Sequence, residues 1–104
     1  MKIALITACL AGLAHSKMAA VAMEKEAKRR KHEIVIEEQG GHKIPVKLTQ
    51  AQIDEADVII VAKAVSIAGK DRFNGKKVLE VNINRVLRDV KGTMDKAEKL
   101  FKQG

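Results

Sequence analysis

The chain opens with KIALITACLAGLAHS at residues 2–16, an apolar run that ends in a single cysteine, a glycine-containing segment and a histidine–serine pair. The continuous apolar run over Ile3–Thr7 is typical of a strand that is covered on both faces, as in a parallel sheet. Cys9 follows the end of this strand, and the three- and four-residue spacing of a helix begins near His15. A strand, a tight connection and a helix in this order predict the first unit of a parallel α/β sheet.

The rest of the chain continues the alternation of strands and helices. Thr49 and Gln52 fit the capping box of a short helix. Asn82 is predicted to cap the last helix, which is expected to bend at Gly92, because glycine weakens the middle of a helix. The expected elements after the first strand are, in order, a helix over 15–31, a strand over 33–38, a short helix over 53–56, a strand over 58–62, a loop with room for one helical turn over 63–77, a strand over 78–81 and the last helix.

This order predicts an α/β three-layer sandwich, in which a four-stranded parallel sheet carries helices on both faces. Right-handed crossovers, together with the shorter or charged character of the second and fourth strands, favour the strand order 2-1-3-4. Ligands of such sheets bind beyond the carboxyl ends of the strands where the chain reverses direction, and Cys9 is expected there. Residues 1–104 are expected to form a single domain.

The charge of the chain bears on the class of partner. Lysine and arginine exceed aspartate and glutamate by 20 to 13, so a non-enzymatic basic binding module is one alternative function. A nucleic-acid partner is not expected, because Trp and Tyr are absent and bases would have little to stack on. A metal site is not expected either, because the three histidines and one cysteine lack close ligand spacing.

The first residues also imitate an export signal. Lys2 precedes an apolar run, and Ile6–Cys9 resembles a lipoprotein cleavage box, but this box stands too close to Met1 for a full leader. No stretch approaches the ~20 apolar residues that span a bilayer. The only cysteine cannot form an internal disulfide, which suits a reducing compartment, so a cytoplasmic location is expected.

Cys9 is the candidate nucleophile. Backbone N–H groups of a short loop and of a helix start converge on anions, and such surroundings lower the pKa of a thiol from about 8.5. A cysteine phosphatase has the same loop spacing but an arginine in the place of His15, so a small cysteine-dependent phosphatase is a second alternative. An inert, buried cysteine is the third. The candidate phosphate-binding residues are Leu10, Ala11, Gly12, Leu13, Ala14, His15 and Ser16.

Several short motifs along the chain match one known family. They are Ile6–Cys9, Gly12, Ala14–Ser16, Met18–Ala20, Glu38–Gly40, Leu48–Thr49, Ala56–Val58 and Arg72–Phe73. Together they resemble the fructose-type enzyme IIB components of the bacterial phosphoenolpyruvate-dependent sugar phosphotransferase system. The family usually has proline after the cysteine and threonine after the histidine, where this chain has Leu10 and Ser16.

The resemblance implies a IIB-like phosphocarrier without a cofactor. A phosphohistidine on a IIA partner would donate its phosphoryl group to Cys9, and the phosphocysteine would pass it to a fructose-like sugar held by the membrane IIC transporter. The protein would be cytoplasmic and would associate transiently with the inner face of the membrane through IIC. Candidates for the face that meets the partner or the sugar are Gln39, Gly40, Arg72 and Phe73.

Two further expectations concern packing. Met18, Met23 and Met94 stand at helical spacing and are expected in the core, whereas His32 and His42 are expected in solvent. The identity of the sugar, the oligomeric state and the role of His15 are left open by the sequence.

Overall fold

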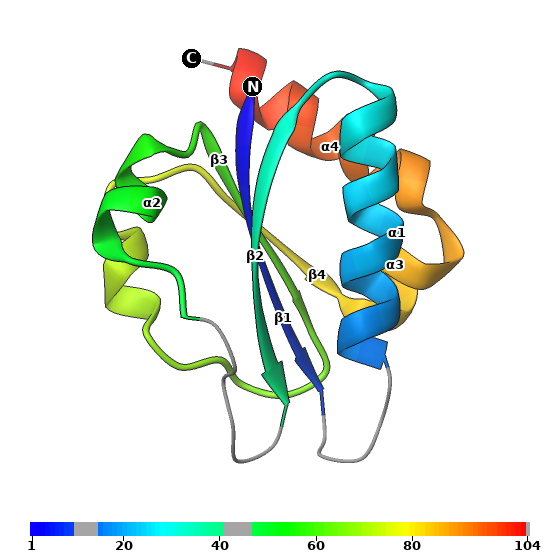
Figure 1. Ribbon diagram of the computed structural model, residues 1–104, viewed down its shortest axis with the longest axis horizontal. Coiled ribbons are helices and arrows are strands. Elements are labelled where there is room, and N and C mark those ends of the chain that lie inside the picture. The colour runs from blue at the N-terminus through cyan, green and yellow to red at the C-terminus, as the bar shows by residue number, and fades with distance from the viewer. Residues whose placement is uncertain (10–14, 41–46, 104) are drawn as a thin grey trace.

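The computed structural model describes residues 1–9, 15–40 and 47–103. Its four strands form one sheet in the order β2-β1-β3-β4, and every pair of neighbours is parallel. The predicted strand order 2-1-3-4 is confirmed (Figure 1). The strands are β1 (Lys2–Cys9), β2 (Glu33–Gly40), β3 (Val58–Lys63) and β4 (Val78–Asn82).

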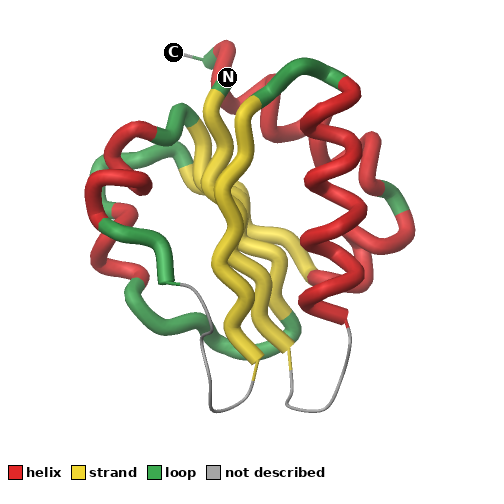
Figure 2. The backbone as a smooth tube through the Cα atoms, in the orientation of Figure 1, coloured by secondary structure: helices red, strands yellow, loops and turns green. Residues whose placement is uncertain are grey.

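Helices cover both faces of the sheet, so the molecule has the three predicted layers (Figures 1 and 2). One face carries α1 (His15–Arg29), α3 (Ile83–Arg88) and α4 (Val90–Lys102), and the other carries α2 (Gln50–Glu55) and the short 3-10 helix η1 (Lys70–Phe73). The two central strands are apolar because they are covered from both sides.

Alternation along β1 sends its side chains into two separate cores. Leu5 and Cys9 pack in the core beneath α1, α3 and α4, whereas Ile6 and Ala8 pack beneath α2 and η1. The side chain of Cys9 therefore belongs to the α1 layer.

The packing of α1 corrects two expectations. Met23 and Met94 are buried as predicted, but Met18 is 53% exposed because it lies on the outer face of the helix. His32 is half-buried rather than in solvent, since its Nε2 lies 2.7 Å from a carboxylate oxygen of Glu98. His42 lies outside the described residues.

The last helix is broken one turn earlier than predicted. It divides at Asp89 rather than bending at Gly92, and the Asp89 side chain accepts a hydrogen bond of 2.9 Å from the Gly92 N–H. Aspartate is a favoured residue at a helix N-terminus, so this side chain starts a new helix in the middle of the apolar pattern. The Asn82 cap of the first part is confirmed, because its side chain accepts from the backbone N–H of Asn84.

The capping box of the short helix is confirmed. The Thr49 hydroxyl accepts from the Gln52 N–H at 3.1 Å, and the Gln52 side chain accepts from the Thr49 N–H at 2.9 Å. The helix begins at Gln50, three residues before the predicted start. Within the part of the chain that the structure describes, no helix has the length and apolar character needed to cross a membrane.

Candidate functional site

Cys9 is the last residue of β1, which ends beside β2 at the carboxyl edge of the sheet (Figure 1). It pairs in register with Gly40, the last residue of β2. On its other side, the N–H of Ala64 donates to the carbonyl of Ala8 at 2.8 Å, which continues the alignment with β3. The chain leaves β1 for one face of the sheet and β2 for the other, so Cys9 occupies the switch point at which parallel sheets bind ligands.

The first turn of α1 brings a hydroxyl to the sulfur. The Ser16 Oγ donates a hydrogen bond of 2.9 Å to the Cys9 Sγ, and both side chains are buried. The first backbone N–H groups of a helix have no acceptor within the helix, so the start of α1 is a place where further donors can serve a ligand. A sulfur nucleophile with a hydroxyl donor beside it is suited to a transfer reaction.

The structure covers only part of the predicted phosphate-binding loop. His15 is the first residue of α1 and is half-buried, next to the buried Ser16. Leu10, Ala11, Gly12, Leu13 and Ala14 lie outside the described residues. Their role as a phosphate cradle therefore stays a prediction.

The sequence analysis did not identify the buried hydroxyl of Thr7, which lies on the same face of β1 as Cys9. Thr7 stands two residues before Cys9 and is fully buried, and its Oγ1 has no hydrogen-bond partner among the described residues. Threonine is common in strands, so its position in the sequence gave no signal.

A buried ion pair lies on the opposite face of the sheet. The carboxylate of Glu37 is completely buried and meets both terminal nitrogens of Arg72, at 2.8 and 2.9 Å. The Leu48 N–H and the Gln39 side-chain amide donate to the same carboxylate, at 2.7 and 2.6 Å. Burial raises the pKa of Glu37, but the hydrogen bonds from Arg72, Gln39 and Leu48 outweigh it, so the pKa lies below its usual value.

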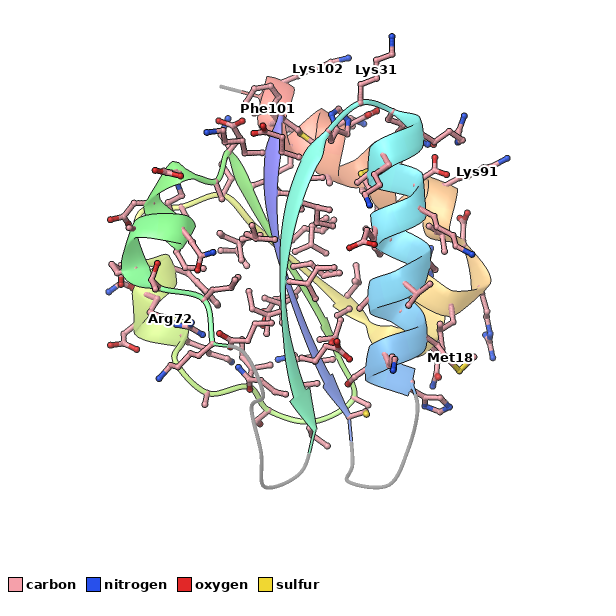
Figure 3. All side chains as sticks on the ribbon, viewed as in Figure 1. Met18, Lys31, Arg72, Lys91, Phe101 and Lys102 are labelled. Atoms are coloured by element: carbon pink, nitrogen blue, oxygen red, sulfur yellow. The ribbon has the colours of Figure 1, made fainter. Side chains whose placement is uncertain are left out.

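This network engages three of the four residues predicted at a partner or sugar face. Gln39 also exchanges two hydrogen bonds with the backbone of Ala68, and Phe73 is buried beneath the Arg72 guanidinium, which lies 5.4 Å from its ring centre. Figure 3 shows Arg72 on the side of α2, away from α1. Of the four, Gly40 is the one that pairs with Cys9, and contact of all four with a partner stays a prediction.

Sequence reasoning did not find Glu37. An acidic residue near the end of a strand is usually read as an exposed edge charge, and its partner Arg72 stands 35 positions later in a loop. The one available signal was Arg72 itself, which the resemblance had singled out without its partner.

A hollow of about 500 Å³ with a mixed polar and apolar lining adjoins the carboxyl ends of β3 and β4. On its wall, the Lys63 Nζ lies 3.1 Å from a carboxylate oxygen of Glu80, and this hydrogen bond lowers the pKa of Glu80. Within residues 1–9, 15–40 and 47–103, no group of three or more His, Cys, Asp or Glu side chains is arranged to hold a metal ion.

Comparison with known proteins adds three findings. A family model described as the lactose/cellobiose-specific IIB subunit of the PTS system matches residues 4–101. The PTS system fructose-like EIIB component 2 of Escherichia coli (strain K12) is 37% identical over 97 residues, which cover 93% of this chain and 92% of that protein. The PTS system fructose-specific EIIABC component of Bacillus subtilis (strain 168) is 40% identical over 96 residues, which cover 92% of this chain and 15% of that protein.

A solved structure has the same architecture. The crystal structure of a predicted fructose-specific IIB from Escherichia coli superposes with a TM-score of 0.91 at 30% identity, and the match covers 96% of this chain and 88% of that one. The likeness therefore extends over both cores and over the carboxyl edge where Cys9 lies.

Proposed function

The chain belongs to the IIB subunits of the sugar phosphotransferase system, as a fructose-like IIB component, and from this membership we propose that Cys9 carries the phosphoryl group. IIB components are phosphotransferases, so the chemistry requires one nucleophile that also leaves readily. Cys9 is the only cysteine in the chain and ends the central strand at the ligand-binding edge of the sheet. The hydrogen bond from Ser16 to its sulfur is the observation that supports this choice best.

The proposed reaction has two transfers. The Sγ of Cys9 attacks the phosphorus of a phosphohistidine on the donor, an S–P bond forms, and the N–P bond breaks with its electron pair returning to the imidazole nitrogen. A hydroxyl oxygen of the sugar then attacks the same phosphorus, and the S–P bond breaks to restore the thiolate. The proton of the sugar hydroxyl leaves to a base or to water. Thiolates serve both steps because they are good nucleophiles and good leaving groups.

The surrounding residues would orient the phosphoryl group. Ser16 would hold the sulfur through its hydroxyl before transfer, and afterwards the same donor would be within reach of a phosphoryl oxygen. Residues 10–16 would supply backbone N–H groups, which bind phosphate well where a helix begins. His15 adjoins this donor set at the first position of α1.

The partners follow from the same membership. Relatives such as the Bacillus subtilis EIIABC component name A, B and C parts within one chain, which supports PTS partners in general. We propose that a IIA protein donates to this chain and that a membrane IIC protein presents a fructose-like sugar to it. The chain would then act as one phosphocarrier domain over residues 1–104, in the cytoplasm and transiently at the inner face of the membrane.

The direct test is transfer from a phosphorylated IIA protein of a fructose system, followed by mass spectrometry of the intact chain. We expect one phosphoryl group, located on Cys9, that is labile to iodine and is lost in Cys9→Ser. Cys9→Ala serves as a second null variant with a small apolar side chain in the same pocket. Phosphate located on a histidine would refute the mechanism, and steady hydrolysis of an aryl phosphate would favour the phosphatase alternative instead.

A further inference from the structure

An apolar strip lies on the exposed face of α1. Met18 and Val21 are 53% and 46% exposed, and they stand one helical turn apart. With Ala22 they form the floor of a shallow hollow whose ends are two lysines, Lys17 and Lys25. Large apolar side chains that adjoin one another at the surface often mark an interaction site, whereas single ones do not.

The strip begins at the same end of α1 as the proposed phosphoryl acceptor. Met18 follows Ser16 by two residues, and Ser16 bonds to the Cys9 sulfur. Figure 3 shows Met18 on the outer side of α1, near the end of the molecule at which β1 stops. A protein that delivers a phosphoryl group to Cys9 meets the molecule at this end, and the outer face of α1 is the part of the helix left for contact, because the inner face is packed against the sheet.

Another exposed apolar side chain lies elsewhere and has a partner. Phe101 is 40% exposed, but the Lys77 Nζ lies 5.7 Å from the centre of its ring. Figure 3 shows Phe101 at the opposite end of the molecule from Met18. Phe101 is therefore a matched control, because it resembles Met18 in exposure and differs in distance from Cys9.

The charges around the strip favour an acidic partner. Both lysines that flank it are exposed, and the chain as a whole has a net charge of +7. Complementary charge around an apolar centre speeds association and sets orientation, and the apolar centre supplies most of the affinity.

We propose that Met18, Val21, Lys17 and Lys25 form the docking surface for the phosphodonor protein, which would place an apolar patch with an acidic border against α1. This inference rests on the proposed function, since the donor is defined by its transfer to Cys9. Lys17 and Lys25 would steer the encounter, and the strip formed by Met18 and Val21 would hold the donor while its phosphohistidine faces the sulfur.

The test compares neutral variants, so that no new charge is placed near the phosphoryl group. Met18→Gln combined with Val21→Gln is expected to raise the KM for the phosphorylated IIA protein about tenfold and to leave kcat nearly unchanged, as for loss of interface anchors. Phe101→Gln is expected to change neither. Lys17→Gln with Lys25→Gln should slow association at low salt, with the difference shrinking at high salt, whereas Lys102→Gln should not.

Binding of the unphosphorylated IIA protein, measured by calorimetry, separates this inference from the proposed function. If the IIA protein binds and the Met18/Val21 variant weakens that binding, but no phosphocysteine forms, the docking surface stands and the mechanism fails. If Cys9 is phosphorylated and the variant has an unchanged KM, the docking surface is refuted and the mechanism stands. Sedimentation of the chain alone tests whether the strip binds a second copy of the chain instead. If the wild type is a dimer, the Met18/Val21 variant is a monomer and the KM for the IIA protein is unchanged, the strip is a dimer interface and the proposal is overturned.

Discussion

The guanidinium of Arg72 and the carboxylate of Glu37 form a two-point ion pair, with N–O distances of 2.8 and 2.9 Å, across the face of the sheet opposite Cys9. Arg72 also donates to the backbone carbonyls of Leu48 and Gly69. One side chain thus ties the end of β2 to the segment before α2 and to the start of η1. These hydrogen bonds join three segments on the face of the sheet that carries α2.

Arg72→Gln should destabilise the protein strongly. The change leaves the fully buried Glu37 carboxylate without its counter-charge, and losing one partner of a buried pair costs about 3–5 kcal/mol. Urea unfolding followed by circular dichroism measures the difference. Lys70→Gln is the control, because Lys70 is exposed and its nearest carboxylate oxygen is 4.0 Å away. A loss below about 1 kcal/mol, the size of a surface pair, would contradict the structural role of Arg72.

A second acidic group should make the fold sensitive to low pH. Hydrogen bonds from Arg29 and Arg30 lower the pKa of Glu26 to about 2, so its ionised form is favoured in the folded state. A group with a lowered pKa stabilises the fold above its unfolded pKa, and this stabilisation is lost as pH falls through the folded value. Between about pH 4.5 and pH 2, the free energy of unfolding should therefore fall, and Glu26→Gln should make that fall shallower.

The control for the acid prediction is Glu24→Gln on the same helix. Glu24 is half exposed and its pair with Lys28 is 3.6 Å long, so its removal should leave the pH dependence as it was. Denaturant titrations at several pH values give the slope for each variant. Equal slopes in the wild type and Glu26→Gln would show that Glu26 does not contribute.

The sequence predicted those features that depend on local pattern. Continuous apolar runs located the central strands, and the Thr49 capping box located α2. The pattern also placed Cys9 at the switch point, since strand order follows from chirality and strand exposure. Ser16 was among the predicted phosphate-binding residues, but its hydrogen bond of 2.9 Å to the sulfur depends on tertiary structure.

The misses have tertiary causes. Met18 follows the helical period as well as Met23 does, and only the position of α1 on the sheet decides which of them is buried. His32 is held by Glu98, which lies 66 positions away. The pairing of Glu37 with Arg72 could not be predicted either, because a single sequence does not indicate which residue of a later loop lies near a given strand residue.

Ser16 should control the rate of phosphoryl transfer. Ser16→Ala removes the donor to the Cys9 sulfur and is expected to slow transfer from the phosphorylated IIA protein at least about tenfold, the usual effect of a hydrogen bond to a charged group. Ser16→Thr keeps the hydroxyl and should retain most of the rate. The measurement is the single-turnover rate of phosphocysteine formation. If alanine transfers as fast as threonine, the hydroxyl has no part in the reaction.

The cap between α3 and α4 leads to an unusual prediction for Gly92. Alanine in place of a helical glycine normally stabilises a protein by about 0.5–1 kcal/mol. Here an added Cβ would overlap the carboxylate of Asp89. This carboxylate accepts a hydrogen bond from the Gly92 N–H and so caps the N-terminus of α4. Gly92→Ala should therefore displace the cap, whose loss costs about 1 kcal/mol, and the two effects should cancel or leave a net loss.

A double-mutant cycle isolates this effect. With Asp89→Ala already present the cap is gone, so Gly92→Ala should then stabilise by the full amount of about 0.5–1 kcal/mol. The cycle needs four unfolding curves, one each for the wild type, the two single variants and the double variant. A coupling energy near zero would mean that the Asp89 carboxylate can move aside without losing its hydrogen bond. A clear coupling would establish that the side chain of Asp89, with room made by Gly92, divides the apolar stretch of 83–101 into two helices.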